Sequence, residues 1–130
     1  MSLIRKLLGQ TGEDAAERYL REKGYRILER NYRLKMGEVD IIALDRDTVV
    51  FVEVKTRRGI SHGPPAEAVD LRKQRQIVKA ATAYIIGKKL RDVSCRFDII
   101  SIIVAGAGDG GETSPRIDHI VSAFEAGSFF

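Results

Sequence analysis

Two neighbouring segments near the middle of the chain have the pattern of β-strands. Residues 37–45 and 50–57 are rich in apolar and β-branched side chains, and the more polar residues 46–49 separate them. Such runs, bounded by turn-forming polar residues, are typical of two strands joined as a hairpin. The pattern therefore predicts a hairpin close to the centre of a β-sheet.

The remaining elements are predicted around this hairpin. Apolar residues at helical spacing predict one helix that begins after Thr11 and ends near Lys23, and a longer one from Ala66 to about Gly87. Strand patterns cover residues 25–33, 95–105 and 116–124. A strand, a helix and a strand in one sheet are joined by a right-handed parallel crossover. We therefore expect an α/β domain, a mixed β-sheet flanked by helices, in the order α-β-β-β-α-β-β.

Composition limits the class of protein. A chain of 130 residues predicts a single domain, residues 1–130, with 1–10 and 125–130 loosely ordered at its ends. No apolar run approaches the roughly 20 residues of a membrane span, and the N-terminus lacks a signal-peptide pattern, so a cytoplasmic protein is expected. The single cysteine, Cys95, excludes an internal disulfide and is expected to be a small core residue. A net charge of +4 suits a polyanionic partner.

Three charged residues interrupt the central hairpin. Asp40 lies in its first strand, and Glu53 and Lys55 lie in a second strand that is otherwise apolar. Because strand side chains alternate between faces, Glu53 and Lys55 share a face with Phe51. A strand that is apolar on both faces is usually covered on both, and a charge there is costly unless it is paired or binds a metal. These charges therefore need a specific reason.

A divalent cation would supply that reason. If Asp40 and Glu53 lie opposite each other, their carboxylates would repel by roughly 4 kcal/mol at a separation of about 4 Å and an effective dielectric constant of about 20. Mg²⁺ is commonly held by one or two carboxylates and several waters. Lys55 would then assist an attacking water or stabilise charge on a phosphate. The alternative is structural, with Glu53 and Lys55 forming a solvated pair and Asp40 serving as a turn residue.

The motif around these residues resembles a known family. Gly-Glu-Val-Asp, ending at Asp40, and Phe-Val-Glu-Val-Lys-Thr-Arg, starting at Phe51, are similar to the Asp…Glu-x-Lys signature of restriction-endonuclease-like nucleases. More narrowly, the chain resembles the YraN-like family of predicted endonucleases, which is related to archaeal Holliday junction resolvases. The resemblance extends from Gly12-Glu13 through Gly24-Tyr25 to Ala123-Phe124.

The resemblance implies a site and a reaction. Asp40, Glu53, Lys55 and Glu13 would be catalytic, and Asp40, Glu53, Glu13 and the carbonyl group of Val54 would hold Mg²⁺ or Mn²⁺. Glu17 competes with Glu13 for the helix-borne position. The substrate would be DNA, including branched or structured DNA, and symmetrical cleavage of two strands would require a homodimer.

Basic and polar residues near this motif are candidates for binding nucleic acid. They are Arg33, Lys35, Thr56, Arg57, Arg58, Lys73 and Gln76, with Arg30 and the loop residue His62 close by in sequence. The structural alternative is that the strand residues among them form a solvent-exposed sheet edge and the helix residues form an ordinary solvent-exposed helix face. Farther along the chain, Arg96 and Asp98 are expected to form a structural pair, and His119 is expected to be structural too.

Three functions remain open from the sequence. The preferred one is a metal-dependent endonuclease. The second is a nucleic-acid-binding module that has the fold and the basic loops but no catalysis. The third is a structural or partner-binding protein, for which no salt-dependent affinity for nucleic acid is expected.

Overall fold

The computed structural model describes residues 3–58, 69–104 and 116–126, and the side chains of these residues apart from 3–11, 58 and 104. The described elements follow the predicted order, α-β-β-β-α-β-β. They are α1 (Leu3–Glu22), β1 (Arg26–Leu34), β2 (Gly37–Asp45), β3 (Thr48–Arg58), α2 (Leu71–Gly87), β4 (Ser94–Val104) and β5 (Arg116–Phe124).

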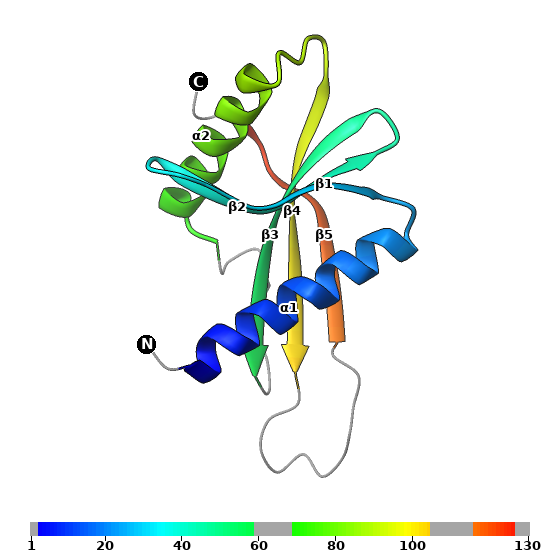
Figure 1. Cartoon of the computed structure of the whole chain (residues 1–130), viewed down its shortest axis with the longest axis vertical. Helices are drawn as coiled ribbons and strands as arrows, with labels where there is room; N and C mark the ends of the chain where they lie inside the picture. The colour runs from blue at the N-terminus through cyan, green and yellow to red at the C-terminus, as the bar shows by residue number, and fades with distance from the viewer. Residues whose placement is uncertain (1–2, 59–68, 105–115, 127–130) are drawn as a thin grey trace.

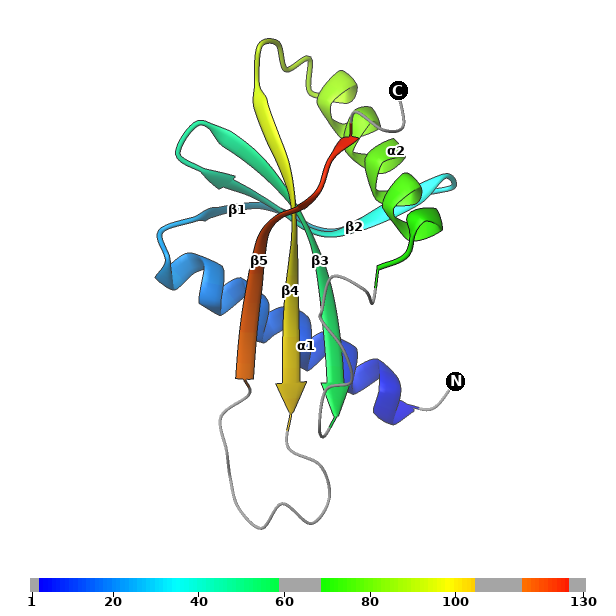
Figure 2. The same ribbon diagram turned by 180° about the vertical axis from the view of Figure 1, so that it is seen from behind.

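The strands form one mixed sheet in the order β1-β2-β3-β4-β5, so β3 is the central strand. β2 and β3 pair antiparallel as the predicted hairpin, and β3 and β4 pair in parallel, as the crossover through α2 requires. The other two pairings are antiparallel. Helix α1 crosses one face of this twisted sheet, and α2 lies against the other face at its opposite end (Figures 1 and 2).

Each helix covers its own hydrophobic core. Ala16 and Leu20 of α1 pack with Val50 and Val52, whereas Ile77 and Tyr84 of α2 pack on the face of β3 that carries Phe51. Alternate residues of β3 therefore enter different cores, as the sequence predicted, and the strand is buried on both faces. Glu53 lies two residues after Phe51, on the α2 side, and its side chain must be accommodated inside this packing.

Both helices begin at residues other than the predicted ones. Helix α1 begins at Leu3, so Thr11 lies inside the helix and is not its N-cap, and residues 3–10 are helical instead of forming a loose lead. Leu3, Ile4, Leu7 and Leu8 continue the helical spacing of apolar residues toward the N-terminus, which explains the longer helix. Helix α2 begins at Leu71, after the predicted start.

The start of α2 is fixed by a cap. The Asp70 side chain accepts a hydrogen bond from the Lys73 N–H at 2.9 Å, as an N-cap residue does. Val69, which was expected within the helix, lies before it and is buried in the core on the α2 side. Residues 66–68 of the predicted helix, the loop residue His62 and the tail residues 127–130 lie outside the described residues.

The prediction that Cys95 is a core residue is wrong. Cys95 is exposed, because it is only the second residue of β4 and precedes the part of that strand that both helices cover. By contrast, Phe97, two residues farther along β4, is buried against Phe51 and Phe124, with ring centroids 5.5 and 5.1 Å apart.

Two glycines permit close approaches that position the helices. A Cβ atom at Gly37, where β2 begins, would overlap the backbone carbonyl group of Gln76 in α2. A Cβ atom at Gly12 would overlap the side chain of Thr56 on β3. Both α1 and α2 are thus brought against the central hairpin by the lack of a side chain at one position.

Gly37→Ala is expected to lower the free energy of unfolding by about 1–3 kcal/mol, because the new methyl group would force the β1–β2 turn away from α2. Urea denaturation measures the change. Gly87→Ala is the matched control, since a Cβ atom there meets nothing within 4 Å. Equal stability of Gly37→Ala and Gly87→Ala would contradict the close packing of this turn.

Candidate functional site

Asp40 and Glu53 are brought together by the β2–β3 pairing. Ile41 pairs with Val52, so Asp40 and Glu53 are the next residues of the two antiparallel strands. The two carboxyl groups are close enough for Asp40 to raise the pKa of Glu53. Asp40 is held in place by the Val54 N–H, which donates to Asp40 Oδ2 at 2.8 Å. The two acids of the motif therefore form one pair on neighbouring strands.

The Glu53 carboxyl group is in an unfavourable environment for a charge. The residue is only 3% exposed, and its Oε1 atom is buried without a hydrogen-bond partner. Burial and, after it, the neighbouring Asp40 raise the pKa of Glu53 to about 8, although Lys73 and Lys55 oppose the shift. A buried carboxyl group of this kind favours either a proton or an additional cation.

Two lysines approach the same carboxylate oxygen of Glu53. Lys55 Nζ lies 3.9 Å from Glu53 Oε2, and Lys73 Nζ, which comes from α2, lies 3.7 Å from it. Burial alone would lower the pKa of Lys73, but Glu53 and Glu38 outweigh it and the pKa lies above its ordinary value. Lys73 therefore remains a cation, and positive charge lies on one side of the acid pair while Oε1 is left without a partner.

Helix α1 contributes Glu13 to the vicinity of Asp40. Burial and the charge of Asp40 raise the pKa of Glu13, whereas Arg30 lowers it. Glu17 instead contacts Arg21 at 3.0 Å and Arg30 at 3.4 Å. Of the two glutamates considered for the helix-borne position, Glu13 is thus the one that interacts with Asp40.

Arg30 is engaged by acids of α1. Its guanidinium group lies 3.5 Å from Glu13 and 2.7 Å from Asp14, in addition to its contact with Glu17. Arg30 was named as lying close to the candidates for binding nucleic acid. In this structure its guanidinium group instead pairs with acids of α1 and so joins β1 to α1.

The residues present fit a hard divalent cation. Asp40 and Glu53 offer carboxylate oxygens from neighbouring strands. Glu53 Oε1 is buried without a hydrogen-bond partner, so this oxygen is available as a ligand. No group of three or more His, Cys, Asp or Glu side chains close enough to hold a metal occurs in the described part of the chain. The pair thus matches a Mg²⁺-type site, in which one or two carboxylates, water and substrate share the coordination.

The predicted nucleic-acid-binding residues lie at several places around the pair. Arg33, whose side chain is 70% exposed, contacts Glu38 at 3.3 Å, and Lys35 lies in the adjoining β1–β2 turn. Thr56 packs at Gly12, and Arg57 follows it on β3. Gln76 adjoins the same turn through its backbone. The side chain of Arg58 lies outside the described part.

Glu38 belongs to the Gly-Glu-Val-Asp motif and lies at the candidate site, but no role was predicted for it from the sequence. It lies two residues before Asp40, and its carboxylate contacts both Arg33 and Lys73. Its spacing from Asp40 was the available signal, because alternate residues of a regular strand share a face. Its partner on α2 became evident only from the fold.

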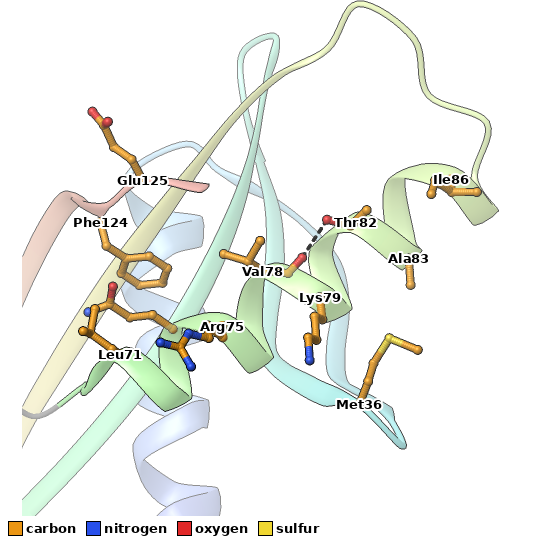
Figure 3. A pocket seen from close by; sticks show the side chains of 11 residues that line it. Met36, Leu71, Arg75, Val78, Lys79, Thr82, Ala83, Ile86, Phe124 and Glu125 are labelled. Carbon is orange, nitrogen blue, oxygen red and sulfur yellow. Dashed lines mark hydrogen bonds between the residues drawn. The ribbon is translucent and has the colours of Figure 1, made fainter. Parts of the chain in front are cut away.

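A separate hollow lies on the outer side of α2 (Figure 3). Its volume is about 1100 Å³. It is lined by Met36, Leu71, Gln74, Arg75, Val78, Lys79, Thr82, Ala83, Ile86, Phe124 and Glu125. None of these lining residues belongs to the acid pair or its lysines, so the candidate chemistry is assigned to the pair and not to the hollow.

A second polar cluster lies under α1. Asp98 is fully buried and contacts Arg96 at 3.0 Å and His119 at 2.7 Å, and the Ser122 N–H also donates to it at 3.0 Å. Tyr19 of α1 contacts the other ring nitrogen of His119 at 3.1 Å. This network confirms that Arg96 and Asp98 are paired and gives His119 a structural role.

Comparison with known proteins gives the family. The model of the uncharacterised protein family UPF0102 matches residues 12–102 of the chain, which include the central hairpin and all of α2. The chain belongs to the UPF0102 family. The resemblance to the YraN-like family is thereby confirmed.

Other UPF0102 proteins are similar over nearly their whole lengths. The one from Chlorobium phaeobacteroides is 49% identical over 124 residues, which are 95% of this chain and 98% of that protein. The one from Geobacter sulfurreducens is 51% identical over 120 residues, 92% of this chain and 90% of that protein. Within the described part of this UPF0102 chain, no helix is both long and apolar enough to cross a membrane.

Proposed function

We propose that this UPF0102 protein is a metal-dependent endonuclease that hydrolyses phosphodiester bonds in DNA, including branched or structured DNA. The observation that carries the proposal is the juxtaposition of Asp40 and the buried Glu53 on neighbouring strands, in which Glu53 Oε1 lacks a partner while two lysines approach Oε2. A buried acid that is left with an unpartnered oxygen beside a second acid is costly to stability. A binding function for a cation explains why it is present.

Each side chain has a role in this proposal. Asp40 and Glu53 would hold Mg²⁺ or Mn²⁺, with the Val54 carbonyl group and Glu13 as further candidates. The bound cation would supply positive charge to the oxygens of the phosphodiester. Lys55 would orient the attacking water and stabilise negative charge that develops on the phosphate. Lys73, anchored on α2, would bind a phosphate beside the reacting one.

The rest of the proposal concerns partners and location. Arg33, Lys35, Thr56, Arg57, Arg58 and Gln76 would contact the nucleic-acid backbone around the pair. A homodimer would supply two sites for symmetrical cleavage of a branched substrate. A cytoplasmic location, with access to DNA, belongs to the same proposal.

Asp40→Asn and Lys55→Ala are each expected to reduce Mn²⁺-dependent cleavage by about 100-fold or more, because each removes charge at the reacting centre. The assay uses linear, flapped and four-way DNA with wild type alongside both variants. Glu22→Gln, which changes an exposed acid at the end of α1, is the control and should cleave like wild type.

The outcomes separate the candidate functions. Cleavage that persists in both site variants would come from a contaminating nuclease and would remove the support for this site. Salt-dependent binding of nucleic acid by wild type, without cleavage of any DNA or RNA in Mn²⁺, would favour a non-catalytic binding module. Absence of both binding and cleavage would favour a partner-binding protein.

A further inference from the structure

Glu38 bridges two cations at the edge of the candidate site. Its Oε1 atom lies 3.2 Å from Lys73 Nζ, and its Oε2 atom lies 3.3 Å from Arg33 Nε. Lys73 comes from the first turn of α2, and Arg33 comes from β1. One carboxylate therefore holds two basic side chains from different elements in a fixed relation.

This arrangement has the form of an occupied anion site. Phosphate, like a carboxylate, presents oxygens that accept charge-assisted hydrogen bonds from arginine and lysine. The two cations that face the Glu38 oxygens could equally face two oxygens of one phosphate. Exposed ion pairs of this kind are weak, and the Glu38 side chain is 40% exposed, so a phosphate can displace it.

The position of Lys73 connects this subsite to the acid pair. The same Nζ atom that contacts Glu38 lies 3.7 Å from Glu53 Oε2. A phosphate bound in place of the Glu38 carboxylate would thus contact the same Lys73 ammonium group that lies beside Glu53. The turn between β1 and β2 is held against α2, because Gly37 packs directly on the Gln76 carbonyl group.

We propose that Arg33 and Lys73 form a subsite for a backbone phosphate of nucleic acid, and that Glu38 fills this subsite in the free protein. The inference rests on the proposed function, since it assigns a place to a phosphate adjacent to the one that reacts. Glu38 acts as a competitor for the two cations. Its removal therefore strengthens binding.

Glu38→Gln is expected to bind a short labelled DNA duplex about three- to tenfold more tightly than wild type at low salt, because its neutral amide releases Arg33 and Lys73. Binding is measured in EDTA, which prevents cleavage, over a series of KCl concentrations. The gain should shrink as KCl is raised, since salt screens exposed charges. Glu22→Gln removes an exposed carboxylate elsewhere and is the matched control for net charge.

A double-mutant cycle distinguishes the subsite from a general charge effect. In the Arg33→Gln, Lys73→Gln background, Glu38→Gln should give no more gain than Glu22→Gln. If the gain from Glu38→Gln only equals that from Glu22→Gln, or if it persists without the two cations, the subsite would be overturned while the nuclease function stays intact.

Failure of wild type and Glu38→Gln alike to bind any DNA or RNA would overturn both proposals. Competition by inorganic phosphate alone at low concentration would indicate a site for free phosphate and would overturn the assignment to the nucleic-acid backbone.

Discussion

Glu53→Gln is expected to abolish Mn²⁺-dependent cleavage and, in EDTA at pH 8–9, to raise the free energy of unfolding by roughly 1–3 kcal/mol. Loss of cleavage follows from the removal of a carboxylate that would hold the cation. The gain in stability follows because the neutral amide replaces an acid that is 3% exposed and lies against Asp40. Few substitutions in a buried strand would raise stability and remove activity together.

The expected pH dependence has a definite sign. The pKa of Glu53 is about 8 in the folded protein, against an ordinary value of 4.5. Between these values the folded state binds more protons than the unfolded state, so this contribution to stability is full below pH 4.5 and is lost as the pH rises to about 8. Urea titrations of wild type in EDTA should show this decline, and Glu53→Gln should lack it.

Metal addition provides the independent control for Glu53→Gln. Mg²⁺ or Mn²⁺ at pH 8 should raise the melting temperature of wild type, because a ligand that binds only the folded state stabilises it. The variant should not respond. An equal shift in both proteins, or a variant less stable than wild type at pH 8–9, would contradict the assignment of Glu53 as a strained cation ligand.

Asp98→Ala is expected to lower the free energy of unfolding by about 3–5 kcal/mol, as expected when one partner of a buried charged network is removed. Asp98 is fully buried and accepts hydrogen bonds from Arg96, the His119 ring and the Ser122 N–H. Its removal leaves the His119 imidazole and the half-buried Arg96 guanidinium without this acceptor, although Arg96 keeps its contact with Asp45 at 2.8 Å. Tyr19 of α1 then loses a fixed partner in His119. Urea denaturation at pH 7 measures the loss.

A neighbouring ion pair gives the matched control for Asp98. Asp118 pairs with Arg116 at 3.3 Å on β5, but the two side chains are 35% and 73% exposed. Asp118→Ala should therefore cost less than about 1 kcal/mol. Similar losses in Asp98→Ala and Asp118→Ala would show that the buried network does not hold α1 to the sheet.

Acid should weaken the same network. Burial alone would raise the pKa of Asp98, but hydrogen bonds from His119 and Arg96 outweigh it and the pKa lies below the ordinary value of 3.8. The contribution of Asp98 to stability is thus present above that value and is lost as the pH falls through the lowered pKa. Wild type should lose this contribution in strong acid, and Asp98→Ala should have none to lose.

The predicted hairpin and its faces were correct because they depend on local pattern. Apolar and β-branched residues on both faces of residues 50–57 predicted a strand covered on both sides, and Val52 and Phe51 indeed enter different cores. The strand begins two residues earlier than predicted, at Thr48. The pairing of Asp40 with Glu53 was a supposition from the sequence, because the predicted break at residues 46–49 would place Asp40 opposite Lys55. In the structure Asp45 pairs with Thr48, and this tighter turn sets the register that brings Asp40 and Glu53 together.

The helix starts and Cys95 were predicted less well because they depend on context. Thr11 is a good capping residue, but the apolar spacing of residues 3–8 continues the helix through it. Asp70 determines where α2 begins, since its side chain accepts a hydrogen bond from the Lys73 N–H. The exposure of Cys95 depends on where two helices stop covering a strand, which the strand's own sequence does not encode.

Residues of the chain that are distant in sequence meet only through the fold. Lys73 reaches Glu38 and Glu53 because α2 packs back across the sheet, and Glu13 interacts with Asp40 because α1 crosses the other face. Arg30, for which the sequence left open a solvated edge or a phosphate contact, is paired with three acids of α1. Its sequence neighbours gave no sign of this, because those acids lie in a helix that precedes the strand.

The sequence by itself determined the order of elements and the two faces of the central strand, because strand alternation acts over a few residues. Only the tertiary structure decided which cations surround the acid pair, which oxygen of Glu53 lacks a partner and which acid holds Arg33 and Lys73. Those features depend on how two helices dock on opposite faces of one sheet. Burial and charge at the site are properties of that docking, and no short stretch of the chain contains them.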